Sequence, residues 1–342
     1  MHRLADKNCL NQINLPDQIR VSLGTAIVLG LLEGKLDANP TTAYLMTYKK
    51  GKCAANCSFC PQARTSKSNN ELLSRVTWPI FPTPNVLTTL AAMTKEGKIK
   101  RVCIQALNYP NVFVHLEALV RELKKSLSTP VSVSCQPQNN TNIQRLALAG
   151  VDRLGISLDA ATEALFNKVK GSGRGCLYTW ENQFRQLKKA ITVFGKGNVS
   201  THVIVGLGET EKQAIEIIQQ CVDLSVLPAL FAFTPVRGTA LEAQLPPKIE
   251  GYRRIQLARY LIIHEKKNVN EMQFDSEGKI VGFGVSGETL NALVEEGLPF
   301  RTSGCPDCNR PFYNEKPNGP LYNYPNHPNK EEIEKIKKQL RY

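Results

Sequence analysis

The stretch "AYLMTYKKGKCAANCSFCPQAR" (residues 43–64) joins an apolar segment of strand length to a loop that carries Cys53, Cys57 and Cys60 within eight residues. Thiolates this close together in one loop can turn toward a common centre. A closed zinc site would need a fourth Cys or His, and none stands nearby in the sequence. An iron–sulfur cubane with one iron left open accounts for three cysteines without a fourth.

Apolar segments of strand length alternate with longer amphipathic segments along the chain. Strands are expected at 43–48, 100–106, 131–135, 153–158, 199–206 and 229–233, with two weaker ones at 272–275 and 279–285. Helices are expected at 84–97, 112–127, 140–149, 160–169, 178–194, 209–224 and 248–267. This alternation predicts an α/β fold with a TIM-like (β/α) barrel, complete or partial. A doubly wound open sheet is the alternative, but no Gly-rich turn follows the first strand.

Three regions are expected. Residues 1–40 form an N-terminal helical segment that includes the apolar stretch 25–36, and residues 41–285 form the barrel. Residues 286–342 form an irregular C-terminal extension rich in Pro, Asn and Tyr, which ends in a helix at 330–341. Because the chemistry of such barrels sits at the C-terminal ends of the strands, the three-cysteine loop lies where an active site is expected.

Composition excludes several classes of protein. The 342 residues contain no apolar run long enough for a membrane span, so a soluble, cytoplasmic protein is expected. Half of the ten cysteines fall in two tight groups, which favours metal binding in a reducing compartment over a disulfide framework. The net charge of +13 is best interpreted as solvated helix faces, because no appended RNA-binding module or aromatic-interleaved basic patch is found. Nucleic acid is therefore not an expected partner.

The pattern C-x3-C-x-aromatic-C, with Phe59 before the last cysteine, resembles the motif of the radical S-adenosylmethionine (SAM) superfamily. The resemblance implies a [4Fe–4S] cluster on Cys53, Cys57 and Cys60, whose open iron binds the amino and carboxylate groups of SAM. One electron, from a donor such as ferredoxin or flavodoxin, then cleaves SAM to a 5′-deoxyadenosyl radical. That radical abstracts a hydrogen from an unactivated carbon.

Further segments between roughly residues 40 and 245 resemble the parts of this superfamily that contact SAM. These segments are "IQALN" (104–108), "GISLDAATEALFNKVKG" (155–171), "VIVGLGET" (203–210) and "FTPVRGTALE" (233–242). The SAM-binding residues that the resemblance implies are Phe59, Gln105, Ser157, Asp159, Val205, Gly206 and Arg237, with Lys170 as a further candidate. For Asp159, the N-cap of a helix is an equal interpretation.

Within the superfamily, "CSFCPQAR" and "VGLGET" look most like biotin synthase and its relatives. Biotin synthase holds a second cluster with cysteines on the second, third and fifth strands and an arginine. Cys103 and Cys135 match the first two positions, whereas Ser200 stands at the third and residues 270–276 contain no arginine. These departures argue against biotin synthase itself.

A second C-x2-C, Cys305 and Cys308, lies in "RTSGCPDCNRPFYNE" (301–315). A zinc site or an inert tail are alternatives, but zinc would need two more ligands and no second C-x2-C exists. An auxiliary [4Fe–4S] cluster is therefore favoured. Its further thiolates are expected from Cys9, if the N-terminal segment crosses the barrel rim, and from Cys135, with Cys103 as a competing donor. Cys176 and Cys221 are expected on helices, buried as small apolar residues.

The segment "RTSGC" is similar to a C-terminal segment of lipoyl synthase in which a serine ligates a sacrificial auxiliary cluster, which makes Ser303 and Arg301 the catalytic candidates. Lipoyl synthase of the single-protein type has three closely spaced N-terminal cysteines, and this chain has only Cys9 there. The pattern therefore resembles most the biotin synthase-related proteins of archaea and anaerobes that form a split, two-protein lipoyl synthase.

This resemblance implies sulfur insertion into an octanoyl chain carried on a lysine of a lipoyl carrier protein or domain. The carbon radical would attack a bridging sulfide of the auxiliary cluster, and a second radical SAM subunit would be a partner. Three alternatives stay open. One is another biotin synthase-like enzyme, either of the biotin synthase type or a carbon-skeleton mutase acting on a small molecule. The second is an RNA-modifying radical enzyme, and the third is a non-catalytic iron–sulfur or zinc protein.

Overall fold

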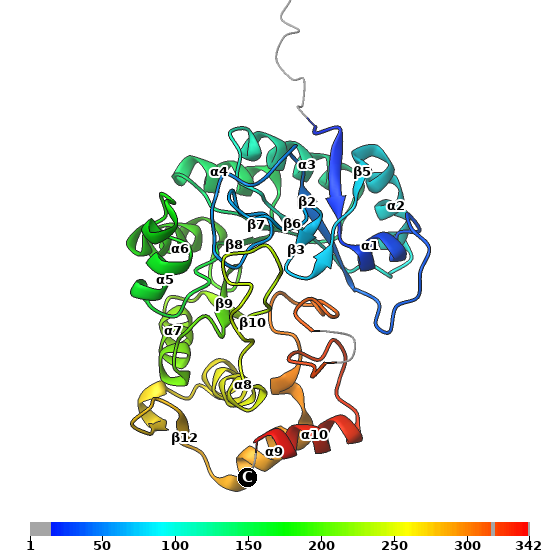
Figure 1. The fold of residues 1–342 in the computed structure, drawn as a ribbon. Helices are drawn as coiled ribbons and strands as arrows, with labels where there is room; N and C mark the ends of the chain where they lie inside the picture. Colours follow the sequence, from blue (N-terminus) through cyan, green and yellow to red (C-terminus); the bar gives the residue numbers. More distant parts are fainter. Residues whose placement is uncertain (1–14, 316–318, 341–342) are drawn as a thin grey trace, which may run out of the picture.

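The computed structural model describes residues 15–315 and 319–340 (Figure 1). Six parallel strands form the inner wall of the molecule, in the order β2 (Thr42–Thr47), β6 (Arg101–Gln105), β7 (Val131–Ser134), β8 (Arg153–Gly155), β9 (Val199–Val205) and β10 (Leu227–Ala232). β1 (Gln18–Val21) pairs antiparallel with β2, and β5 (Ile80–Pro82) pairs antiparallel with β1. The strand order runs from β10 to β5, which do not pair, so the expected TIM-like barrel is confirmed in its partial form.

Helices follow the parallel strands and cover their outer faces (Figure 1). They are α2 (Thr83–Lys95), α3 (Val112–Ser126), α4 (Asn140–Ala149), α5 (Glu163–Val169), α6 (Trp180–Phe194), α7 (Glu211–Asp223) and α8 (Ile249–His264). Several begin at a side-chain cap, because a Thr or Asn oxygen accepts a backbone N–H of the first turn. Thr210 and Gln213 form a full capping box at the start of α7.

Two regions differ from the sequence-based expectation. The segments 272–275 and 279–285 give a separate hairpin, β11 (Gln273–Phe274) with β12 (Ile280–Gly282), rather than further barrel strands. Among residues 15–40, the described part of the N-terminal region, α1 (Leu23–Val28) is the only helix, and the unpredicted β1 precedes it. A four-residue strand carries too few alternating positions for a sequence pattern to show it.

Alternate side chains of the parallel strands face the barrel interior in rows across the sheet. One row, fixed by the strand register, contains Tyr44, Cys103, Ser132 and Arg153. The next row, two residues closer to the C-terminal ends of the strands, contains Met46, Gln105, Ser134, Gly155 and Ser200. Most of the outward-facing neighbours, such as Leu45 and Ile104, are buried in the hydrophobic core against the helices.

The C-terminal extension contains α9 (Gly287–Glu296), α10 (Lys330–Leu340) and, between them, an irregular cysteine segment (residues 301–310). The cysteine segment contacts the start of β2, where Thr41 N–H donates to Asn309 Oδ1 (3.0 Å). It also contacts β6, where Arg101 Nε donates to the Pro306 carbonyl (2.9 Å). On the other side, the Leu230 N–H of β10 donates to Ser303 Oγ (2.7 Å). The cysteine segment therefore bridges the N-terminal part of the barrel between β2 and β10.

Arg253, a fully buried residue of α8, holds the rest of the extension in place. Its guanidinium donates to the Tyr322 carbonyl (2.7 Å), to the Leu321 carbonyl and to Gln339 Oε1 (2.9 Å). The same group lies over the ring of Tyr324, 5.2 Å from its centroid. Within the described residues, no helix is long and apolar enough to cross a membrane.

We expect Arg253→Met to lower the free energy of unfolding by about 3 kcal/mol, because it leaves buried carbonyl groups without donors. Urea denaturation followed by circular dichroism measures this change. Arg121→Met is the matched control: its exposed pair with Glu117 on α3 should be worth less than about 0.5 kcal/mol. Equal losses in the two variants would contradict the anchoring role of Arg253.

Candidate functional site

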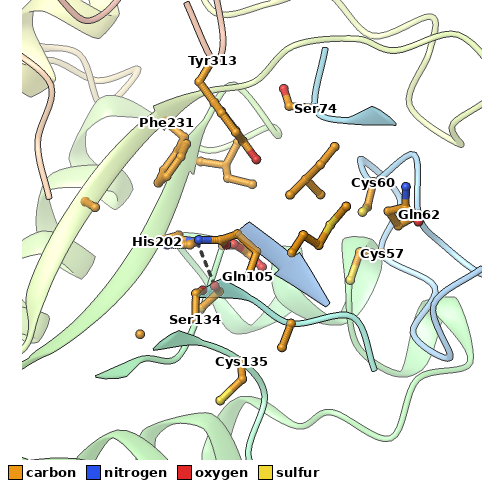
Figure 2. Close-up of a pocket in the computed structure, with 18 of the residues that line it drawn as sticks. Cys57, Cys60, Gln62, Ser74, Gln105, Ser134, Cys135, His202, Phe231 and Tyr313 are labelled. Carbon is orange, nitrogen blue, oxygen red and sulfur yellow. Dashed lines mark hydrogen bonds between the residues drawn. The ribbon is translucent and has the colours of Figure 1, made fainter. Parts of the chain in front are cut away.

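A cavity of about 260 Å³ lies inside the barrel and is lined by both groups of cysteines. Cys53, Cys57 and Cys60 come from the loop that follows β2, at the C-terminal ends of the strands. Figure 2 shows Cys57 and Cys60 on one side of this cavity, with His202 and Phe231 on the other. The second group lies nearer the N-terminal ends of the strands and consists of Cys103 on β6 with Cys305 and Cys308 of the cysteine segment.

Local hydrogen bonds fix the shape of the three-cysteine loop. Cys53 N–H donates to the Gln62 carbonyl (2.9 Å), which closes the loop on itself, and Cys60 N–H donates to the Cys57 carbonyl (3.1 Å) in a tight turn. Asn108, just beyond β6, donates its backbone N–H to Cys53 Sγ (3.1 Å). The loop therefore presents its three sulfurs on a backbone that is tied to two strands of the barrel.

Burial raises the pKa of the Cys53 and Cys57 thiols and raises the pKa of Cys60 to about 12. For Cys57, the nearby Lys170 ammonium acts in the opposite direction because it favours the thiolate. Three thiolates in such a place need a positive centre, which iron supplies when it displaces the protons. The donor set and its burial therefore fit an iron–sulfur cluster.

Cys176 lies beside this loop rather than on a helix, contrary to expectation. It follows the 3-10 turn Ser172–Arg174 and accepts the Asn56 N–H on its sulfur (3.1 Å). Asn56 itself lies between two of the cluster cysteines in the sequence. Cys176 thus supports the backbone of the three-cysteine loop, while Cys221 is buried on α7 as expected.

Ser157, Asp159 and Lys170, three of the residues implied to bind SAM, come together at the cavity wall. Lys170 Nζ donates to Asp159 Oδ2 (2.6 Å) and to the Ser157 carbonyl (2.5 Å), and both charged side chains are buried. Asp159 has a φ of 69°, a left-handed conformation that is uncommon outside Gly and Asn. The N-cap of α5 is Thr162, so the helix-cap interpretation of Asp159 is not what the structure shows.

The other implied SAM residues are placed differently from one another. Phe59 and Gln105 line the cavity. Val205 is buried in β9, and Gly206 turns the chain with a φ of 105°, where a Cβ atom would lie 2.7 Å from Pro247 Cδ. Arg237 is exposed, and none of these last three residues lines the cavity.

The second group of cysteines consists of Cys103, Cys305 and Cys308. Burial raises the pKa of Cys103, and Cys305 and Cys308 act in the same direction. Ser132, the neighbour of Cys103 in its row, has its Oγ 3.6 Å from Cys305 Sγ. Cys103 Sγ accepts Gln105 Nε2 (3.1 Å), so this glutamine is oriented toward the second group of cysteines. Tyr44 Oη lies 3.3 Å from Cys308 Sγ.

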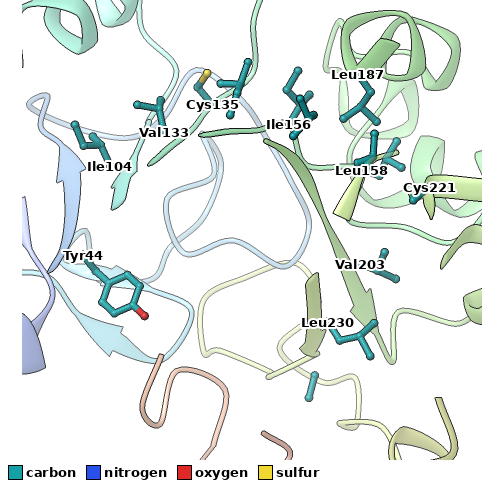
Figure 3. Packing of buried hydrophobic residues seen from close by; sticks show 14 of the residues in the cluster. Tyr44, Ile104, Val133, Cys135, Ile156, Leu158, Leu187, Val203, Cys221 and Leu230 are labelled. Atoms are coloured by element: carbon teal, nitrogen blue, oxygen red, sulfur yellow. The ribbon is translucent and has the colours of Figure 1, made fainter. Parts of the chain in front are cut away.

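The remaining residues expected to be cluster ligands or catalytic residues differ in their position relative to the cavity. Cys135 lines the cavity (Figure 2) and also packs in the hydrophobic core with Val133 and Ile156 (Figure 3); burial alone raises its pKa, with no contribution from another cysteine. Cys9 lies outside the described residues. Ser303 lines the cavity, whereas Arg301 is exposed and pairs through its backbone with Tyr324.

The structure adds cavity residues that the sequence analysis did not identify, chiefly Tyr44, His202 and Arg310. For Tyr44 and His202 a signal exists, because polar or large side chains recur at every second position of β2 and β9. His202 Nδ1 lies 2.9 Å from Ser157 Oγ. For Arg310 no local signal exists, since it lies in an irregular segment.

Among the described residues, no three His, Cys, Asp or Glu side chains converge as they would around one metal ion. A cubane does not require such convergence, because its thiolates bind different irons. Tyr313 lines the same cavity; burial raises its pKa, and Cys60 and Cys103 act in the same direction.

Residues 49–221, half of the chain, match the family described as the Radical SAM superfamily. The chain belongs to this superfamily of enzymes. Membership implies a [4Fe–4S] cluster and SAM as cofactors, in agreement with the three-cysteine loop and its burial.

More particular similarities are to biotin synthases. The biotin synthase of Christiangramia forsetii is 26% identical over 253 residues, which are 70% of this chain and 64% of that protein. The biotin synthase of Sulfurihydrogenibium sp. is 27% identical over 213 residues, 58% of this chain and 56% of that protein. The chain thus spans less than two thirds of the length of these relatives. A solved structure of methylornithine synthase (PylB) is similar with a TM-score of 0.49 and 16% identity, covering 62% of this chain and 61% of that one.

His202 generates a pH prediction. Burial lowers its pKa to about 4; Arg310 and Lys170 add to this effect, while Asp159 opposes it. An unfolded His titrates near its ordinary value of 6.5, so stability is lost as the pH falls from 6.5 toward 4. We expect the free energy of unfolding of His202→Gln to fall by roughly 2 kcal/mol less than that of the wild-type protein over this pH range. The difference is smaller than for a His packed entirely in the core, because the His202 ring faces the cavity.

Urea unfolding of the wild-type protein and of His202→Gln, at pH values from about 7.5 to about 4, measures this difference, because a His side chain titrates within that range. Parallel stability curves for the two proteins would contradict the burial of a neutral His202.

Proposed function

We propose that this protein is a radical SAM enzyme that inserts sulfur into an alkyl chain, specifically a protein-bound octanoyl chain in the formation of the lipoyl cofactor. The observation that carries the proposal is one cavity that is lined by the three-cysteine loop and, further toward the N-terminal ends of the strands, by Cys103, Cys305 and Cys308, with Cys135 as a further lining cysteine. One group suits the cluster that generates the radical, and the other suits an auxiliary cluster as the source of sulfur. Similarity to biotin synthases supports sulfur chemistry in this branch of the superfamily.

The walls between the two groups of cysteines support an alkyl substrate. Met46, Ile204, Phe231 and Ala232 supply apolar surface there, as expected for a site that takes a hydrocarbon chain. His202 is neutral at physiological pH and offers hydrogen bonding without a charge. An apolar cavity also excludes water, which protects a carbon radical from side reactions.

When bound, the two clusters and SAM supply a radical that removes hydrogen from the substrate and a sulfide that forms the new carbon–sulfur bond. The chain's own residues orient these groups. Lys170 and Asp159 form a buried ion pair beside Cys57, where a cofactor with both a carboxylate and an ammonium group finds opposite charges. Ser303 Oγ lies at the cavity wall but accepts the Leu230 N–H, so a role as an iron ligand would require it to bind with its remaining lone pair.

The partners proposed are an octanoylated lipoyl carrier protein or domain, a second radical SAM subunit and an electron donor such as ferredoxin or flavodoxin. The net charge of +13 supports acidic partners. The second candidate function is a biotin synthase-like reaction on a small molecule. The relatives favour it, whereas Ser200 on β9, where a cysteine is expected in biotin synthase, argues for a ligand set unlike that of biotin synthase itself.

Iron and sulfide analysis after anaerobic reconstitution tests for two clusters. We expect the triple variant Cys53/Cys57/Cys60→Ala to keep about half of the wild-type iron, because the second group of cysteines is intact. The complementary triple variant Cys103/Cys305/Cys308→Ala should also keep about half, and it should still cleave SAM. A first triple variant without iron would overturn the sulfur-insertion proposal.

Cys103 and Cys135 provide a matched pair on neighbouring strands. We expect Cys103→Ala to lose the auxiliary iron and Cys135→Ala to keep it, because Tyr44 and Ser132, the neighbours of Cys103 in its row, contact Cys308 and Cys305. The measurement is the iron content of each variant in the Cys53/Cys57/Cys60→Ala background. Loss of iron in Cys135→Ala alone would instead support the ligand set inferred from the sequence.

The substrate is tested by incubation of the wild-type protein with SAM, a reductant and an octanoyl-lysine peptide. Mass spectrometry should detect 5′-deoxyadenosine and a peptide that has gained sulfur. In Cys305→Ala, we expect 5′-deoxyadenosine without the sulfur-containing peptide. If desthiobiotin rather than the octanoyl peptide gains sulfur in the wild-type protein, the small-molecule alternative is correct.

A further inference from the structure

Arg310 is a cavity residue whose charge has no carboxylate partner. Within residues 15–315 and 319–340, no Asp or Glu oxygen forms an ion pair with it. Its Nη2 donates to the Ser303 carbonyl (2.6 Å) and, more weakly, to the Leu230 carbonyl (3.4 Å). Its Nε is buried and has no hydrogen-bond acceptor in the described structure.

The position of Arg310 is strongly determined by its surroundings. The guanidinium carbon lies 3.8 Å from the centroid of the Phe231 ring, a close cation–π contact. The backbone has a φ of 31°, in the left-handed region that costs free energy for an arginine. Both features hold the charged group in the cavity although solvent would hydrate it better.

Arg310 is half-buried, so its charge is partly removed from water, and its buried Nε–H lacks an acceptor among the described residues; both are unfavourable. The backbone of Arg310 ties it to the second group of cysteines. The backbone N–H of Arg310 donates to Tyr44 Oη (2.9 Å), and the same hydroxyl lies 3.3 Å from Cys308 Sγ. A metal-bound thiolate has no proton, so in that state Tyr44 donates its hydroxyl proton to Cys308.

We propose that Arg310 is the counter-charge of an anionic iron–sulfur cluster held by Cys103, Cys305 and Cys308, with Tyr44 as a hydrogen-bond donor to the Cys308 sulfur. This inference rests on the proposed function, because it requires the auxiliary cluster. Arg310 acts as a positioning residue: its charge stabilises the more negative, reduced state of the cluster and raises the reduction potential. A substrate carboxylate is the competing ligand for the same guanidinium.

The experiment measures the midpoint potential of the auxiliary cluster by EPR-monitored redox titration in the Cys53/Cys57/Cys60→Ala protein. In this background, we compare Arg310→Met, Arg310→Lys and Tyr44→Phe. Arg185→Met, an exposed arginine on α6, is the control for the loss of one positive charge. We expect a shift to more negative potential in Arg310→Met, a smaller shift in Arg310→Lys and in Tyr44→Phe, and none in Arg185→Met.

If a variant binds its cluster too poorly for a redox titration, the iron content of the Arg310→Met and Arg310→Lys proteins tests the proposal instead. Loss of iron in Arg310→Met with retention in Arg310→Lys supports the counter-charge, whereas equal loss in both overturns it. Retained iron with an unchanged potential and EPR spectrum in Arg310→Met also overturns it and leaves the substrate as the ligand. If the background protein itself binds no iron, both this inference and the proposed function fail; an unchanged potential in an iron-loaded protein removes only the role of Arg310.

Discussion

The open edge of the barrel is the constraint on which the rest of the structure depends. A six-stranded parallel sheet that does not close has an unpaired edge at β10, and its interior would be open to water there. The cysteine segment satisfies part of this edge through the Ser303 hydroxyl, which accepts the Leu230 N–H. The same short segment carries Cys305 and Cys308, which line the cavity. The contacts that cover the open edge of the barrel therefore also position two cysteines of the second group.

Buried polar groups hold the part of the C-terminal extension that follows the cysteine segment. An irregular backbone cannot satisfy its own carbonyls, so α8 supplies Arg253 and Gln256 to do it. Glu315 has a similar role: its carboxylate is buried and accepts the N–H groups of Asn314 and Asn323. Because burial raises the pKa of Glu315, these donors are what favour its charged form.

The sequence allowed the strand order and the three-cysteine loop to be predicted, because both depend on local patterns. Strand–helix alternation specifies a parallel sheet, and a cysteine loop after its first strand must lie at the C-terminal end of the barrel. The second group of cysteines depends on contacts between residues some 200 positions apart, which no local pattern encodes. Cys103 and Cys135 look alike as strand cysteines and both line the cavity, but Cys103 stands in an inward row of β6, whereas Cys135 lies just beyond β7 and packs in the hydrophobic core. Arg310 lies in the same irregular segment, and no sequence pattern indicates that its side chain reaches the cavity.

The inward rows of the sheet have a further consequence for the geometry of the reaction. Side chains of one strand reach the same face every second residue, and adjacent rows on that face are therefore about 7 Å apart. Cys103 stands one row below Gln105, while the three-cysteine loop begins above the last residues of β2. The strand position of Cys103 therefore sets how far the second group of cysteines lies from the three-cysteine loop. Under the proposed function, a relative with that cysteine one row higher or lower would modify a different carbon.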